Sequence, residues 1–163
     1  MNDPFQPTLA TRRSAALELR LSHGDWKSVC LVLRDLLSWQ DHALADIEAH
    51  EDLHPNTQAA IHHAFRMNRR ALTSMRYAIE NALNRKGLST ITPSIGPTVR
   101  ILVRHSGFAE LPDLIDDYRM CLLDHPDPTE RVMAKGYLLL LERVAPQVPA
   151  QLPFLSKQPP VPF

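Results

Sequence analysis

Hydrophobic and polar residues alternate along most of this chain with the period of an α-helix that buries one face. Two long segments show this most clearly, 26–53 and 56–86, where apolar side chains recur at steps of three and four positions. Asp25 is placed to cap the start of the first segment, and Gly87 to end the second. Because the residues around Pro55 are typical of a turn, we predict a hairpin of two long helices.

Four shorter segments carry the same kind of signal and bring the predicted helices to about six. They are 8–21, 97–105, 112–123 and 128–144. The last begins at Asp127-Pro128 and is apolar on nearly all sides from Tyr137 to Leu141, which predicts a central, buried helix. Gly136 inside it would permit close approach by a neighbouring helix, or is simply tolerated. The predicted fold class is all-α, a single-domain irregular helical bundle or a short stack of helix pairs.

The last eighteen residues, 146–163, contain six prolines and are predicted to form an extended tail after a helical domain of residues 1–145. Large apolar side chains at Phe154, Leu155 and Phe163 are candidate contacts in this tail. Proline restricts the unbound chain, so docking of such a segment loses less entropy. Two interpretations stay open: a strap over a groove of its own domain, or a linear motif for another protein.

The amino-acid composition limits the classes of function that the chain can have. The chain has 163 residues, 44% of them hydrophobic, with 18 basic and 18 acidic side chains and a formal net charge of zero. A neutral chain has no overall attraction to nucleic acid or to membranes, and neutrality favours self-association, so a homodimer is possible. Cys30 and Cys121 lie among apolar neighbours and are interpreted as core residues in a reducing compartment. No apolar run is long enough to span a membrane, so we expect a cytoplasmic protein.

Charge is distributed unevenly within the predicted hairpin. Five carboxylates come first, Asp41, Asp46, Glu48, Glu51 and Asp52, and six basic side chains follow, Arg66, Arg69, Arg70, Arg76, Arg85 and Lys86. If the two helices pack antiparallel, Arg66 and Arg69 or Arg70 come within about one turn of Asp41 or Asp46. The basic side chains then neutralise the acidic helix, or they bind an acidic protein partner or nucleic-acid phosphates. Arg76, Arg85 and Lys86 lie further from the acidic segment and are better candidates for an outside partner.

A metal site is a weaker candidate. His42, Asp46, His50 and His54 are spaced by four, which aligns metal-ligating side chains along one side of a helix. Carboxylate-bridged metal bundles need further Glu and His residues on facing helices, and zinc needs three or four converging ligands. The sequence supplies neither, so no cofactor is expected.

Enzyme signatures are missing as well, including Gly-rich phosphate loops and nucleophile elbows. We therefore expect a non-enzymatic interaction protein, such as an adaptor, inhibitor or regulatory subunit. It would bind a protein partner through the basic helix face, the tail, or both. Nucleic-acid binding by the arginine-rich helix 56–86 is the alternative, and a metal-binding bundle is third.

Overall fold

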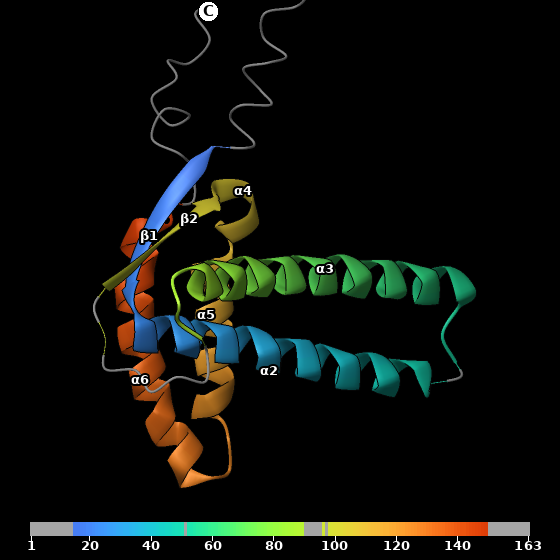
Figure 1. Ribbon diagram of the computed structural model, residues 1–163. Coiled ribbons are helices and arrows are strands. Elements are labelled where there is room, and N and C mark those ends of the chain that lie inside the picture. The colour runs from blue at the N-terminus through green and yellow to red at the C-terminus, as the bar shows by residue number, and fades with distance from the viewer. Residues whose placement is uncertain (1–14, 51, 90–95, 97, 150–163) are drawn as a thin grey trace, which may run out of the picture. The chain divides into compact units, whose positions relative to one another are not determined.

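A computed structural model describes residues 15–50, 52–89, 96 and 98–149 of the chain (Figure 1). The protein is mostly helical, as predicted, with one small two-stranded sheet. Two compact units are distinguished, one from Gly24 to Ile95 and one from the residues on either side of it, up to His23 and from Gly96 onward. The predicted division into residues 1–145 and 146–163 stays a prediction. Among the described residues, no helix combines the length and the apolarity that a membrane span requires.

The unit from Gly24 to Ile95 is the predicted helical hairpin. It consists of α2 (His23–Glu48) and α3 (Pro55–Arg85), which run antiparallel in Figure 1. His54 caps α3, because its Nδ1 atom accepts a hydrogen bond from the Asn56 amide at 3.1 Å, and Pro55 takes the first helical position. Gly87 ends α3 with a φ of 74°, a conformation that glycine adopts without strain. The prediction for α3 is thus confirmed at both ends.

The start of α2 differs from the prediction. The helix begins at His23, so Gly24 and Asp25 lie in its first turn instead of stopping one helix and capping the next. Buried side chains occupy only one end of the hairpin: Trp26, Val29, Cys30, Val32 and Leu33 in α2, and Leu72, Met75, Ile79, Ala82 and Leu83 in α3. Between Arg34 and Ala71, no described residue is buried. In the other half of the hairpin, which contains the turn, the apolar side chains between α2 and α3 are therefore partly exposed.

The second unit contains two strands where two helices were predicted. β1 (Ala16–Ser22) pairs antiparallel with β2 (Thr98–Arg104), with Leu19 opposite Ile101. Burial alternates along both strands up to the end residue Ser22, so that every second side chain, each of them apolar, faces the interior and those between them are exposed. This period of two is the signature of a half-buried strand, so the predicted helices 8–21 and 97–105 are wrong over these residues. Residues 8–14 and 97 lie outside the described part of the chain.

The helices of this unit follow β2 in the order α4 (His105–Phe108), α5 (Leu111–Leu123) and α6 (Pro128–Val144), and the 3-10 turn η1 (Ala145–Gln147) comes last. Asp127 caps α6 as predicted, with its Oδ1 atom accepting from the Thr129 amide at 2.9 Å. α5 and α6 pack closely, and the rings of Tyr118 and Tyr137 meet edge to face with centroids 4.9 Å apart.

The prediction that the last helix is central and buried is wrong. α6 buries a single stripe, Ala134, Tyr137, Leu140 and Val144, whose steps of three and four belong to an amphipathic helix. Leu138 and Leu139 are 39% and 52% exposed. A Cβ atom placed on Gly136 would meet no atom within 4 Å, so no described residue approaches this glycine closely.

The first residues of the predicted tail pack on their own unit. Gln147 hydrogen-bonds to the backbone of Arg20 in β1, and Val148 is buried. His105 Nε2 lies 2.7 Å from the carbonyl oxygen of Pro149. Residues 150–163, with the candidate contacts Phe154, Leu155 and Phe163, lie outside the described residues, so their role stays a prediction.

The two cysteines have different environments. Cys30 is buried, as predicted, whereas Cys121 is exposed, so its assignment to the core is wrong. Removal from water raises the pKa of the Cys30 thiol from its ordinary value of 9.0 to about 12. The carboxylate of Glu80 adds to this rise in pKa, and the guanidinium of Arg76 opposes it.

Candidate functional site

The acidic and basic segments face each other across the hairpin, and one predicted ion pair forms. Arg69 of α3 pairs with Asp41 of α2, and His62 Nε2 lies 3.4 Å from Glu48 Oε1. Both side chains of the Arg69–Asp41 pair are about half exposed (55% and 56%), so the pair contributes at most about 1 kcal/mol to stability. Internal neutralisation is therefore confirmed for Arg69, and it orients the helices more than it stabilises them.

Arg76 is engaged within its own helix. Its Nε atom donates to Glu80 Oε1 at 2.8 Å, which is an ion pair between residues one turn apart. Arg76 was favoured as an outside contact because it lies away from the acidic segment of α2, although Glu80 is an acidic residue within the basic run itself. The spacing of four between Arg76 and Glu80 was the signal that would have identified the pair.

The other basic side chains lie on the surface of α3 and just after it: Arg66, Arg70, Arg85 and Lys86. Among the described residues, none of these four has a carboxylate within ion-pair distance. Arg85 and Lys86 occupy the C-terminal end of α3, where positive charge is favourable because of the helix dipole. Arg66 and Arg70 lie in the middle of the helix, where the dipole gives them no such role.

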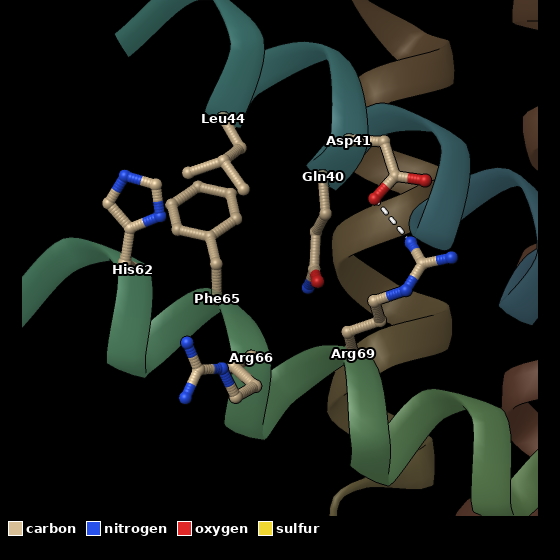
Figure 2. Close-up of a pocket in the computed structure, with 7 residues that line it drawn as sticks. All are labelled: Gln40, Asp41, Leu44, His62, Phe65, Arg66 and Arg69. Carbon is tan, nitrogen blue, oxygen red and sulfur yellow. Dashed lines mark hydrogen bonds and ion pairs between the residues drawn. The ribbon is translucent and has the colours of Figure 1, made fainter. Parts of the chain in front are cut away.

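A cavity of about 210 Å³ opens between α2 and α3 beside Arg66. Its lining consists of Gln40, Asp41, Leu44, His62, Phe65, Arg66 and Arg69. Figure 2 shows Leu44 and Phe65 facing each other between the helices, with the Arg69–Asp41 pair at one end and Arg66 separate from that pair. The Oε1 atom of Gln40 is buried there and has no hydrogen-bond partner among the described residues. The cavity thus combines an apolar wall with a cation, Arg66, that forms no ion pair with a described residue.

A second cavity, of about 310 Å³, adjoins the first, because Arg69 lines both. Its other lining residues are Leu37, Thr73, Arg76, Tyr77 and Glu80. Tyr77 is 60% exposed. We call these two adjoining cavities the hairpin groove. The groove exists because α2 and α3 approach each other less closely than α5 and α6 do.

Sequence reasoning identified only the charged part of this groove. Leu44 and Phe65 are apolar positions of the helix-periodic segments 26–53 and 56–86, a pattern that predicts an interior location, but both are only half-buried. Gln40 and Tyr77 carried no signal, since a single polar or aromatic residue on a helix is common. That these side chains line a groove depends on the spacing between the helices.

The metal candidates do not converge. Within the described ranges, no group of three or more His, Cys, Asp or Glu side chains is arranged to hold a metal ion. His42 Nδ1 lies 2.7 Å from the carbonyl oxygen of Ser38 in its own helix, and His54 Nδ1 serves as the α3 cap. Asp46 and His50 are exposed. The spacing of four would align these residues on one continuous helix, but α2 ends at Glu48, before His50 and His54.

The described residues therefore present one candidate site, the hairpin groove. Its chemistry is that of a contact surface, with apolar walls, two arginines that pair with carboxylates and one, Arg66, that has no carboxylate partner among the described residues. Comparisons of the chain with protein-family models, with curated proteins and with solved structures found no match.

Proposed function

We propose that this protein is a non-enzymatic interaction protein, an adaptor, inhibitor or regulatory subunit, that binds a protein partner in the hairpin groove. One observation carries the proposal: Arg66, in mid-helix and with no carboxylate partner in the described part of the chain, lies beside the half-buried apolar pair Leu44 and Phe65. Arginine and aromatic side chains are enriched among the residues that contribute most to protein–protein binding.

The size of the cavities favours a protein over a small molecule. Sites for small molecules and cofactors usually enclose about 300–1,000 Å³. Each cavity by itself, at about 210 Å³ or about 310 Å³, lies at or below the lower end of that range. Each fits a side chain or two of a partner better than a complete ligand.

The charge of the groove favours a protein over nucleic acid. Asp41 and Glu80 line the groove and occupy two of its three arginines. Phosphates would meet these carboxylates at close range, and like charges repel. A protein segment with one acidic side chain could form its ion pair with Arg66, the groove arginine that has no carboxylate partner among the described residues.

The tail is a second proposed contact. Its described part, 146–149, packs on the unit that contains β1, which supports a role for these residues within the chain. For Phe154, Leu155 and Phe163, contact with a partner remains the proposal. A truncation that tests it should end at Pro149, because removal of the whole predicted tail, 146–163, would also remove Gln147 and Val148, which pack on this unit.

The test is affinity capture from host lysate with the full chain and with Arg66→Glu. Arg100→Glu is the matched control, because it makes the same charge change at an exposed arginine of β2, outside the hairpin. We expect a stoichiometric protein on the wild-type chain and on Arg100→Glu, and its loss on Arg66→Glu. Circular dichroism of all three should show the same helical content.

Three other results would contradict binding of a protein partner in the hairpin groove. Equal capture by all chains would exclude the groove, and loss only on ending the chain at Pro149 would assign binding to the tail. Captured nucleic acid, released steeply with rising salt, would support the alternative function, since phosphate contacts release counterions.

A further inference from the structure

We infer that the partner segment in the hairpin groove is an amphipathic α-helix. It would place two apolar side chains, seven or eleven residues apart, in the two cavities and an acidic side chain against Arg66. This inference rests on the proposed function and adds the conformation and side-chain pattern of the partner. It follows from the spacing of the cavities, the open half of the hairpin and the charges that line the groove.

The spacing of the cavities matches the repeat of a helix. Each cavity has one apolar residue from each helix, Leu44 with Phe65 and Leu37 with Tyr77. Along α2 these residues are seven positions apart and along α3 twelve, so the cavity centres are separated by about 10–18 Å at 1.5 Å per residue. A helix presents the same face again after two turns (seven residues) and after three turns (eleven residues), which are about 10 and 16 Å.

A helix also suits the backbone chemistry of the groove. An extended segment needs hydrogen-bond partners for its amides and carbonyls, as in strand addition to a sheet edge. The groove is bounded by two helices, whose backbone groups are already used in their own hydrogen bonds. A helical partner satisfies its own backbone and needs only side-chain contacts, which is the helix-in-groove mode.

The hairpin has room for a third helix. No described residue from Arg34 to Ala71 is buried, although Leu36, Leu44, Ile61 and Phe65 are all half-buried there. Two helices expose one side of each apolar stripe, and a third helix packed between them covers it. The partner helix would therefore extend over the open half of the hairpin as well as the cavities.

Charge sets the orientation of the partner. Asp41 pairs with Arg69 and Glu80 with Arg76, so among the described arginines that line the groove, Arg66 in the first cavity is the one without a carboxylate partner. An acidic side chain on the partner therefore belongs within one turn of the anchor in the first cavity. The other end of the partner helix has no such requirement.

The experiment is selection of binders to the full chain from a displayed library of random 20-residue peptides. Selected peptides are then measured by fluorescence anisotropy against the wild-type chain, Arg66→Glu, Tyr77→Ala and the control Arg100→Glu. We expect sequences with large apolar residues seven or eleven positions apart and an acidic residue near one of them. Each peptide should gain helical circular dichroism on binding, bind about tenfold more weakly to Arg66→Glu, and bind unchanged to Arg100→Glu.

Tyr77→Ala separates the two ends of the groove. It should weaken peptides with both anchors several-fold, but leave peptides shortened to the first anchor unaffected, because Tyr77 lines only the second cavity. Tyr77 is exposed, so this substitution leaves the interior of the hairpin intact.

The outcomes distinguish this inference from the proposed function. Groove-dependent peptides that bind without helical structure would overturn the inference and leave the proposed function standing. Binders that are insensitive to Arg66→Glu, or the absence of binders, would overturn both. If a peptide of residues 150–163 competes with the selected peptides, the occupant is the chain's own tail, and the partner helix is excluded.

Discussion

The side-chain amide of Gln147 pairs with both backbone hydrogen-bonding groups of Arg20. Gln147 Oε1 accepts from the Arg20 amide at 2.7 Å, and Gln147 Nε2 donates to the Arg20 carbonyl at 2.9 Å. Gln147 thereby imitates one residue of a third strand beside β1. No other strand among the described residues pairs with that edge of β1, and an unpaired strand edge is a template for unwanted association.

Replacing Gln147 with alanine should therefore destabilise the protein by about 1–2 kcal/mol, because each lost hydrogen bond contributes about 0.5–1.5 kcal/mol. The measurement is urea unfolding, with Lys135→Ala as control at an exposed position of α6 that has no described partner. Stability unchanged within about 0.3 kcal/mol would mean that water replaces the amide without loss.

Two glycine-to-alanine substitutions should change stability in opposite directions. Gly136 lies inside α6, where a Cβ atom would meet nothing within 4 Å, so alanine should stabilise the protein by about 0.5–1 kcal/mol. Gly87 has equal space but a φ of 74°, so alanine there should destabilise it by about 1 kcal/mol. Thermal unfolding of both variants is the measurement. Destabilisation by Gly136→Ala would show that another molecule or segment uses the space over this glycine.

Asp127 should be needed for the start of α6. Alanine removes the acceptor of the Thr129 amide and should reduce the free energy of unfolding by about 1 kcal/mol. Asparagine accepts the same bond, so Asp127→Asn should recover most of the loss. If both variants lose equally, the charge near the helix dipole stabilises the helix, and the hydrogen bond does not.

The stability of the hairpin should depend on alkaline pH through Cys30. Burial raises the pKa of this thiol from 9.0 to about 12, so between these values the unfolded chain releases a proton that the folded chain keeps. The free energy of unfolding should then fall as pH rises above about 9, by at most about 1.4 kcal/mol per pH unit. The measurement is the difference in slope between the wild-type chain and Cys30→Ala from pH 8.5 to 10.5. Equal slopes would show that Cys30 ionises in the folded chain as easily as in the unfolded one.

Local signals predicted the helices that the structure confirms. α3 and α6 begin at a capping residue followed by proline, and α3 ends at a glycine with positive φ. Each of these signals depends on residues within one turn of one another. Such interactions form in the same way whatever surrounds the helix, and this is why the boundaries of α3 and α6 were predicted closely.

The two strands were predicted as helices, although both carry apolar residues at every second position. Leu17, Leu19 and Leu21 follow one another at steps of two, and so do Val99, Ile101 and Val103. Each strand is only seven residues long, and its partner lies about eighty residues away in the sequence. A strand of this length is stable only through pairing and packing, which no local sequence signal reveals.

The helical class, the hairpin and the opposition of acidic and basic segments could all be predicted from the sequence, because they depend on periodicity and on an antiparallel turn. Which charged side chains form pairs depends on the folded chain. Arg66 and Arg69 both follow the acidic segment, yet among the described residues a carboxylate, Asp41, lies within ion-pair distance of Arg69 and none lies that close to Arg66. Ion pairs form over a few ångströms between segments distant in the chain, so the folded positions of the side chains, and not the presence of an acidic and a basic segment, decide which arginine is paired.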